Sequence, residues 1–147
     1  MEFREEKRDL FSVPDDYYLA HCISADFAMG KGIVVEFNRR FDMKNKLKAH
    51  YPDYLDRWQQ EKKRSGCILA GRVFNLITKE RYFQKPTYES LRGALECMKT
   101  LCGEKGVRRV AMPVIGCGLD RLEWEKVSAI IREVFSDKGV EVLVCRQ

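Results

Sequence analysis

Lys79 and Asp120 could together carry nucleophilic chemistry. Lys79 directly follows the apolar run 73–78, and Asp120 closes the segment 115–120 after another apolar run. A lysine amine can attack an electrophilic carbon, and a nearby carboxylate can move the protons. Each residue also has an ordinary structural interpretation. Lys79 could be a solvated charge, and Asp120 could be a helix N-cap, since Asp120 and Glu123 form a D-x-x-E capping pattern.

Two glycine-rich segments could bind phosphate. Gly30 and Gly32 precede one predicted helix, and Gly116 and Gly118 precede another. Glycine lets backbone N–H groups turn toward an anion near the positive end of a helix, so the two loops could hold the two ends of a diphosphate. A glycine-rich turn is also often only a turn. The chain has neither a Walker GxxxxGK[ST] motif nor a GxGxxG fingerprint, which disfavours a nucleoside triphosphatase or a hydride-transfer enzyme.

Strands and helices that would position these residues alternate along the chain. Apolar periodicity and turn residues separate the two kinds of element. Strands are predicted at 2–8 (an edge strand), 17–23, 67–70, 73–78, 107–115 and 140–145. Helices are predicted from Ile33 to Phe41, around 54–58, from Pro86 with closure at Gly103 and Gly106, and at 124–135. Such alternation predicts an α/β sheet with helices on both sides and ligand-binding loops at the carboxyl ends of strands.

The composition indicates one soluble globular domain. The chain has 147 residues, of which 45% are apolar and 33% charged, and no apolar run approaches a membrane span. The first residues are charged where a signal peptide would be apolar, so we expect a cytoplasmic protein. The cysteines form no CxxC pair and there are two histidines, so we expect no metal and no cofactor. Cys22, Cys97 and Cys145 lie in apolar segments and are predicted to be core residues.

The net charge of +5 is concentrated in one segment. Residues 38–64 contain nine Lys or Arg and four Asp or Glu. Such a segment can attract phosphate-rich partners, and it can equally be the solvated face of helices on a soluble protein. The charge therefore supports a nucleic-acid partner only as a secondary indication.

Five blocks of the sequence follow one another in a distinctive order. They are His21-Cys22-Ile23-Ser24, Met29-Gly30-Lys31-Gly32-Ile33, Leu76-Ile77-Thr78-Lys79, Lys85-Pro86-Thr87-Tyr88-Glu89 and Met112-Pro113-Val114-Ile115-Gly116-Cys117-Gly118-Leu119-Asp120-Arg121-Leu122. Together they resemble one branch of the macrodomains, the terminal ADP-ribose protein glycohydrolases, and the similarity runs in register from about Asp9 to the C-terminus. The resemblance implies one three-layer α/β/α macrodomain over residues 1–147, with a central mixed, mostly parallel sheet.

The resemblance implies an ADP-ribosyl hydrolase. Its substrates would be ADP-ribose esterified to glutamate or aspartate side chains, and O-acetyl-ADP-ribose. Lys79 matches the lysine that attacks the anomeric carbon of the terminal ribose, and Asp120 matches the carboxylate that resolves the lysine adduct. Two alternatives stay open: a module that binds ADP-ribose without turnover, and a deglycosylase of ADP-ribosylated DNA bases, the activity of a related antitoxin branch. The basic segment 38–64 would then contact phosphates.

The same match assigns the binding residues. Asp9 would hold the adenine amino group with Leu10 beside it, and Ser24 would lie near ribose and phosphate. The loops around the ligand would comprise Gly30, Gly32, Ile33, Val114, Ile115, Gly116, Cys117, Gly118 and Leu119. Arg8 and Lys31 depart from the family pattern, which has a glycine and a small residue at these positions. We expect a monomer that binds ADP-ribose or an ADP-ribosylated protein and does not bind a membrane. ADP-ribosylated nucleic acid stays open as a partner, and a eukaryotic source would also allow a nuclear location.

Overall fold

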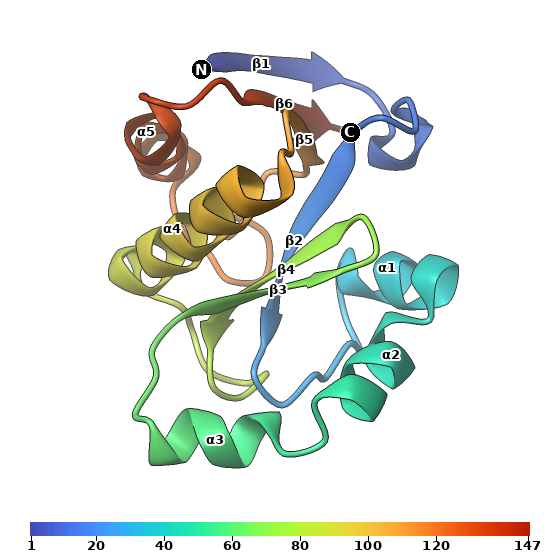
Figure 1. Cartoon of the computed structure of the whole chain (residues 1–147), viewed down its shortest axis with the longest axis vertical. Helices are drawn as coiled ribbons and strands as arrows, with labels where there is room; N and C mark the ends of the chain where they lie inside the picture. Colours follow the sequence, from blue (N-terminus) through green and yellow to red (C-terminus); the bar gives the residue numbers. More distant parts are fainter.

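A six-stranded sheet forms the centre of the computed structural model, which describes residues 1–147 (Figure 1). The strand order is β1-β6-β5-β2-β4-β3, and every neighbouring pair is parallel except β3 with β4. The sheet is therefore mixed and mostly parallel, as predicted. The strands are β1 Glu2–Lys7, β2 Tyr18–Ser24, β3 Gly66–Ala70, β4 Val73–Lys79, β5 Arg109–Met112 and β6 Glu141–Arg146.

Helices cover both faces of the sheet, which confirms the three-layer α/β/α architecture. In Figure 1, α4 and α5 lie on one side and α1, α2 and α3 on the other. Each side has its own apolar cluster: Leu95 and Ile131 belong to the first, and Phe37 and Trp58 to the second. The helices are α1 Val34–Phe41, α2 Met43–His50, α3 Tyr54–Gln60, α4 Tyr88–Lys105 and α5 Trp124–Phe135, with a short 3-10 helix, η1, at Leu10–Ser12.

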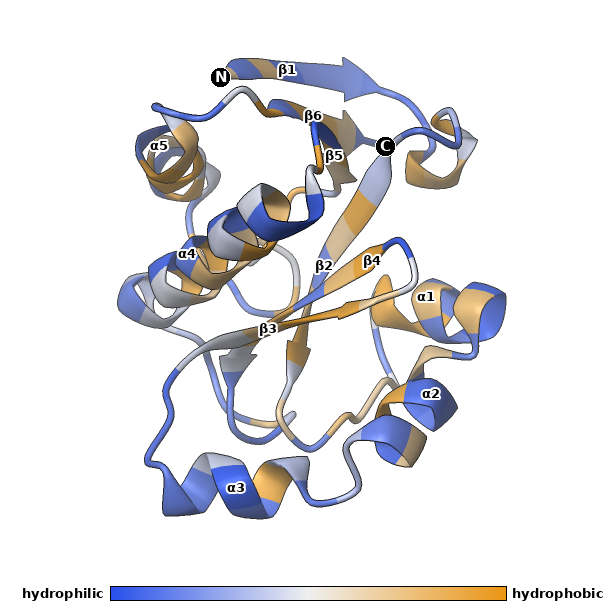
Figure 2. Cartoon of the chain, in the orientation of Figure 1, coloured by the Kyte–Doolittle hydropathy of each residue, from blue (hydrophilic) through white to orange (hydrophobic).

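The central strands are buried because apolar side chains point to both faces. In β2, Ala20 belongs to one apolar cluster, while Leu19 and Ile23 belong to the other. A strand covered on both faces reads as a continuous apolar run rather than an alternating one. Figure 2 shows the same contrast, with apolar β4 inside and hydrophilic outer faces on the helices. None of the helices combines the length and apolar character needed to cross a membrane.

Two helices differ from the predictions: α2 was missed, and α4 ends later than its first predicted closing glycine. The helix α2 was not predicted, because Met43 and Leu47 are its only buried residues and two apolar positions make a weak periodicity. Gly103 lies inside α4 rather than at its end, which is formed by Gly106 in the left-handed region at φ 67°. A glycine tolerates this conformation without the steric cost of a Cβ.

Two further expectations are corrected. The strand predicted to reach Ile115 ends at Met112, because Pro113 has no N–H to continue the ladder. Among the cysteines predicted to be core, Cys145 is buried and Cys22 half-buried, but Cys97 is exposed. The face of α4 that packs on the sheet carries Leu91, Ala94, Leu95 and Met98, and Cys97 points away from it.

Candidate active site

The structure brings the two candidate catalytic residues into direct contact. Lys79 is the last residue of β4, and Asp120 lies in the loop that follows β5. The Nζ atom of Lys79 donates a hydrogen bond to Oδ1 of Asp120 over 2.7 Å. Their side chains are 15% and 16% exposed, so the pair is largely shielded but open to a ligand.

The position of Lys79 is fixed by the strand next to it. The pairing of β2 with β4 shifts after Ile23, so that Ser24 lies opposite Lys79. Beyond this irregularity, the N–H of Ala25 still donates to the carbonyl of Lys79 over 2.9 Å. A break in register at the end of a strand re-aims the side chain there, as bulges near active sites commonly do.

Asp26 ties the segment after β2 to the segment after β4. Its Oδ1 accepts from the Ser24 hydroxyl at 2.5 Å and from the Ala28 N–H at 3.1 Å. Its Oδ2 accepts from the N–H of Tyr82 at 3.0 Å. Lys79 lies between these connected segments. Asp26 was not predicted, although a short carboxylate in a polar segment after a strand is a common organiser of turns.

The loop that carries Asp120 closes on itself around Gly116. The N–H of Leu122 donates to the Gly116 carbonyl over 2.7 Å, and Gly116 has φ 74°. The positive φ favours glycine here, and a Cβ would lie 3.2 Å from Cδ1 of Leu122, a close contact. On the outer side, Nζ of Lys85 donates to the Leu119 carbonyl over 2.7 Å. These bonds present Asp120 toward Lys79.

The helix-cap interpretation of Asp120 is wrong. The helix α5 begins at Trp124 with Glu123 at its N-cap position, and no side chain caps it there. Asp120 lies three residues earlier, and its carboxylate accepts from Lys79 instead. Gly116 lies near the start of α5, because its carbonyl accepts from the N–H of Leu122, two residues before Trp124. In the first turn of α1, the N–H groups of Val35, Glu36 and Phe37 already donate to the carbonyls of Gly32 and Ile33.

Lys79 and Asp120 form the candidate catalytic dyad, and the cysteines near it are poor nucleophiles. Burial, and then the charge of Asp120, raise the pKa of the Cys22 thiol well above its usual range. Burial also raises the pKa of Cys117. Because a thiolate is the reactive form of cysteine, neither thiol competes with the amine of Lys79 at neutral pH.

A cavity of about 350 Å³ lies at the same edge of the sheet. Five of the residues predicted to bind the ligand line it: Leu10, Ile33, Val114, Cys117 and Gly118. Its volume is at the lower end of the range for small-molecule sites. The cavity and the Lys79–Asp120 pair share the loop after β5, because Cys117 and Gly118 line the cavity and Asp120 follows Gly118 by two residues.

Four cavity residues were missed by the sequence predictions: Pro113, Cys145, Arg146 and Gln147. The sequence did contain a signal for Cys145 and Arg146, which lie at the end of β6. The strands β5 and β6 are parallel, so their carboxyl ends, Met112 and Arg146, lie at the same edge of the sheet. Loops at that edge are where open α/β sheets bind ligands.

The other predicted residues lie outside the cavity lining. Asp9 is exposed and caps η1, where its Oδ1 accepts from the N–H of Phe11. Ser24 is buried and donates to Asp26. Ile115 belongs to the apolar cluster under α4 and α5.

The two predicted glycine loops meet through Leu119. A Cβ at Gly32, which has φ 79°, would lie 3.4 Å from Cδ1 of Leu119. Leu119 itself is 58% exposed, and Gly30 has open space around it. No cluster of three or more His, Cys, Asp or Glu side chains could hold a metal ion.

Comparison with known proteins defines the class of protein. The family model of the Macro domain matches residues 23–131. The solved macrodomain of Thermus aquaticus DarG aligns with a TM-score of 0.72 and 24% sequence identity, covering 99% of this chain and 98% of that one. The chain belongs to the macrodomain family, which confirms the predicted resemblance.

Two curated relatives show which members of the family this chain resembles. Bovine ADP-ribose glycohydrolase OARD1 is 46% identical over 141 residues, covering 94% of this chain and 87% of the bovine protein. The DNA ADP-ribosyl glycohydrolase of Thermus aquaticus is 26% identical over 136 residues, covering 86% of this chain and 36% of that protein. The chain is thus most similar, of these two, to the ADP-ribose glycohydrolase.

Proposed function

We propose that this chain is an ADP-ribosyl hydrolase that binds ADP-ribose in the cavity and uses Lys79 as its nucleophile. The observation that carries the proposal is the contact of 2.7 Å between Lys79 and Asp120 at the carboxyl edge of the sheet. A half-buried amine beside a carboxylate is a nucleophile with its own proton acceptor. The substrates would be ADP-ribose esters of glutamate or aspartate side chains, and O-acetyl-ADP-ribose.

Two steps would complete the reaction. Asp120 takes a proton from Lys79, and the neutral amine attacks the anomeric carbon of the terminal ribose. The bond from that carbon to the acceptor oxygen breaks, and the departing carboxylate takes the proton from Asp120, which restores the Asp120 carboxylate. Water, activated by Asp120, then attacks the same carbon, which releases ADP-ribose and returns the amine.

Substitution of the dyad tests this mechanism. We expect Lys79→Ala to lower the release of ADP-ribose from a glutamate-linked substrate by about 100-fold or more, while calorimetry still detects ADP-ribose binding. Lys138→Ala, at an exposed lysine beyond α5, is the matched control and should keep full activity. Undiminished release by both Lys79→Ala and Asp120→Ala would exclude the mechanism. Binding without release from any linkage would identify a reader of ADP-ribose instead.

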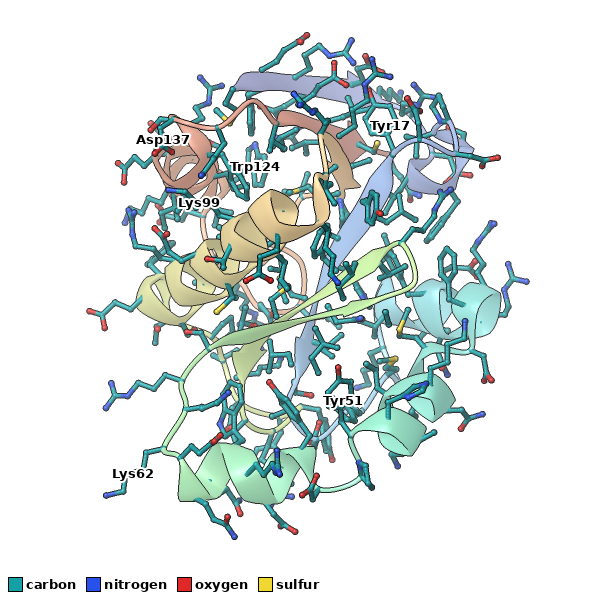
Figure 3. All side chains as sticks on the ribbon, viewed as in Figure 1. Tyr17, Tyr51, Lys62, Lys99, Trp124 and Asp137 are labelled. Carbon is teal, nitrogen blue, oxygen red and sulfur yellow. The ribbon has the colours of Figure 1, made fainter.

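A second candidate acceptor is DNA, and the basic segment 38–64 favours it. Lys46 and Lys48 in α2 have no carboxylate within 4.0 Å, and neither has Lys62, which follows α3 and lies at its outer end in Figure 3. If these cations contact phosphates, affinity for single-stranded DNA should fall steeply as salt rises. Absent or salt-independent binding would remove this candidate.

A further inference from the structure

An exposed apolar surface flanks the catalytic dyad. Tyr82, Phe83 and Leu119 are 65%, 68% and 58% exposed, and no other large apolar side chain in the chain is as exposed. Tyr82 and Phe83 follow Lys79 by three and four residues, and Leu119 directly precedes Asp120. Exposed apolar side chains that gather at one place mark sites of interaction more often than those scattered singly.

The segment that carries the aromatic rings is held in place. The Tyr82 N–H is bonded to Asp26, and the N–H of Arg81 donates to Oε1 of Gln84 over 2.7 Å. The rings of Tyr82 and Phe83 pack edge to face with centroids 5.4 Å apart. Lys85 joins this segment to the Leu119 carbonyl. The three apolar side chains are therefore presented by connected, hydrogen-bonded loops.

This surface lies on the acceptor side of the site. None of its three residues lines the ADP-ribose cavity, which is built from η1, α1, the loop after β5 and the end of β6. The dyad stands where the ribosyl bond would be cut. A substrate that fills the cavity and reaches the dyad must carry its leaving group beyond Lys79 and Asp120. Tyr82 and Phe83 lie on the segment that follows Lys79, so they are placed to meet that leaving group.

The charges around the surface select the kind of acceptor. Lys31, Arg81 and Arg121 have no carboxylate within 4.0 Å, and they outnumber Asp26 and Glu80, the carboxylates on the same segments that have no cation within 4.0 Å, so the unpaired charge near the dyad is positive on balance. Acidic groups are attracted to such a surface. The two rings in an edge-to-face pair, with Leu119 on the loop that Lys85 ties to their segment, make an uneven apolar surface, which suits the side chains of a polypeptide. A nucleobase instead stacks on a flat ring face.

We propose that Tyr82, Phe83 and Leu119 form an acceptor surface that binds the polypeptide on either side of an ADP-ribosylated acidic residue. The inference rests on the proposed function and adds the surface that binds the polypeptide and the neighbouring residues that this surface prefers. The preferred polypeptide has an apolar residue next to the modified one and further acidic residues around it. Small acceptors, such as the acetyl group of O-acetyl-ADP-ribose, do not reach the surface.

The double variant Tyr82→Ser, Phe83→Ser tests the acceptor surface. Its substrates are a glutamate-linked ADP-ribosyl peptide with a neighbouring leucine and acidic residues, and O-acetyl-ADP-ribose. We expect KM for the peptide to rise about tenfold with kcat unchanged, since two exposed aromatic contacts are lost, and the constants for O-acetyl-ADP-ribose to stay the same. Tyr51→Ser, at an exposed tyrosine between α2 and α3 (Figure 3), is the control and should change neither substrate.

Binding supplies a second measurement that does not depend on turnover. In the Lys79→Ala background, calorimetry should show the peptide binding about tenfold more tightly than ADP-ribose, and the double variant should remove this gain. An unchanged gain, or equal losses for the peptide and O-acetyl-ADP-ribose, would overturn the acceptor surface. An effect only on thymidine-linked ADP-ribosyl DNA would replace the polypeptide with nucleic acid. A failure of the proposed function would look different, because the parent protein would then release no ADP-ribose from any substrate. The comparison of peptide and ADP-ribose binding would still test the acceptor surface in that case.

Discussion

The carboxylate of Asp120 has one side-chain partner, Lys79, and this limits what Asp120 can do. It caps no helix, and its loop is held by backbone bonds at Gly116 and by Lys85 at Leu119. Its charge is therefore available for proton transfer without being needed to close the loop. A change that keeps the shape of the side chain but removes its charge should separate chemistry from structure.

Asp120→Asn is such a change. The amide keeps an oxygen for Lys79 but cannot take a proton, so we expect hydrolysis of a glutamate-linked ADP-ribosyl substrate to fall by about 100-fold or more. ADP-ribose affinity and the midpoint of thermal unfolding should stay close to the parent values. A variant that lost binding and activity together would assign Asp120 to ligand positioning rather than proton transfer.

Gly118→Glu should abolish ADP-ribose binding while the fold survives. Gly118 lines the cavity, and a Cβ there would meet no heavy atom within 4 Å, so the new side chain fits the protein. It would occupy the cavity and add a negative charge that repels a diphosphate. Gly103→Glu, at an equally open glycine in α4 outside the cavity, is the matched control for calorimetry. Equal affinity of the two variants would show that the ligand does not occupy this cavity.

At the scale of the elements, the carboxyl ends of β2 and β4 work as one unit because Asp26 connects the segments after them. The Asp26 carboxylate accepts from Ala28 on one side and from Tyr82 on the other, so Lys79 is held between two fixed points. We infer that Asp26 is a positioning residue, because its carboxylate bonds to Ser24, Ala28 and Tyr82 and to neither member of the dyad.

Asp26→Ala should lower kcat by more than it changes ADP-ribose affinity. The loss of both backbone partners would let the segment after β4 drift, and a small misplacement of Lys79 costs rate. Asp26→Asn keeps one accepting oxygen and should recover part of the rate. If Asp26→Ala lowered affinity as much as kcat, or if Asn rescued nothing, the positioning role would be wrong.

Gly103→Ala should stabilise the protein. Gly103 is an exposed interior residue of α4 with open space for a Cβ, and alanine in a helix is favoured over glycine by about 0.5–1 kcal/mol. Urea unfolding would measure the gain. A loss of stability would mean that α4 ends nearer to Gly103, as its sequence first indicated.

The sequence predicts features that depend on neighbouring residues better than features that depend on contacts between distant parts of the chain. The helix α5 was found at its observed bounds because Val127, Ile131 and Val134 form a clear stripe. The meeting of Lys79 with the loop after β5 follows from a general rule for parallel sheets. Asp26 could not be assigned, because its role depends on an N–H of Tyr82, 56 residues away.

At the scale of the whole molecule, a buried histidine links the sheet to the helices on one face. His21 is fully buried in β2, its Nε2 donates to Oδ1 of Asn75 over 2.7 Å, and its ring stacks on Phe37 of α1 at 3.8 Å between centroids. Its Nδ1 has no partner. Burial lowers the pKa of His21 to about 4, so the folded protein keeps this imidazole neutral.

Stability should therefore fall as the pH falls below about 6.5. In the unfolded chain His21 has a pKa of about 6.5, whereas in the folded protein its pKa is about 4. Between these two pH values the unfolded chain binds a proton that the folded protein does not bind. Below pH 6 the contribution to the free energy of unfolding should drop by about 1 kcal/mol per pH unit. Urea unfolding at pH 7, 6 and 5 would measure it. In His21→Gln, which can still donate to Asn75, the dependence should flatten, and an equal slope in both proteins would contradict this origin.

The two apolar clusters share the sheet, so we expect residues 1–147 to unfold as one domain. Coincident transitions in tryptophan fluorescence and far-ultraviolet circular dichroism would show this, since Trp58 belongs to one cluster and Trp124 packs against the other. Separate transitions would indicate two units.

The last two residues bear on how the protein is prepared for such experiments. Arg146 and Gln147 line the cavity, so any purification tag fused after Gln147 starts at its wall and could block the ligand. Met1 precedes Glu2, which pairs with Glu141 at the opposite end of β6. A tag placed before Met1 leaves the cavity free, whereas low affinity in a C-terminally tagged sample would describe the tag rather than the protein.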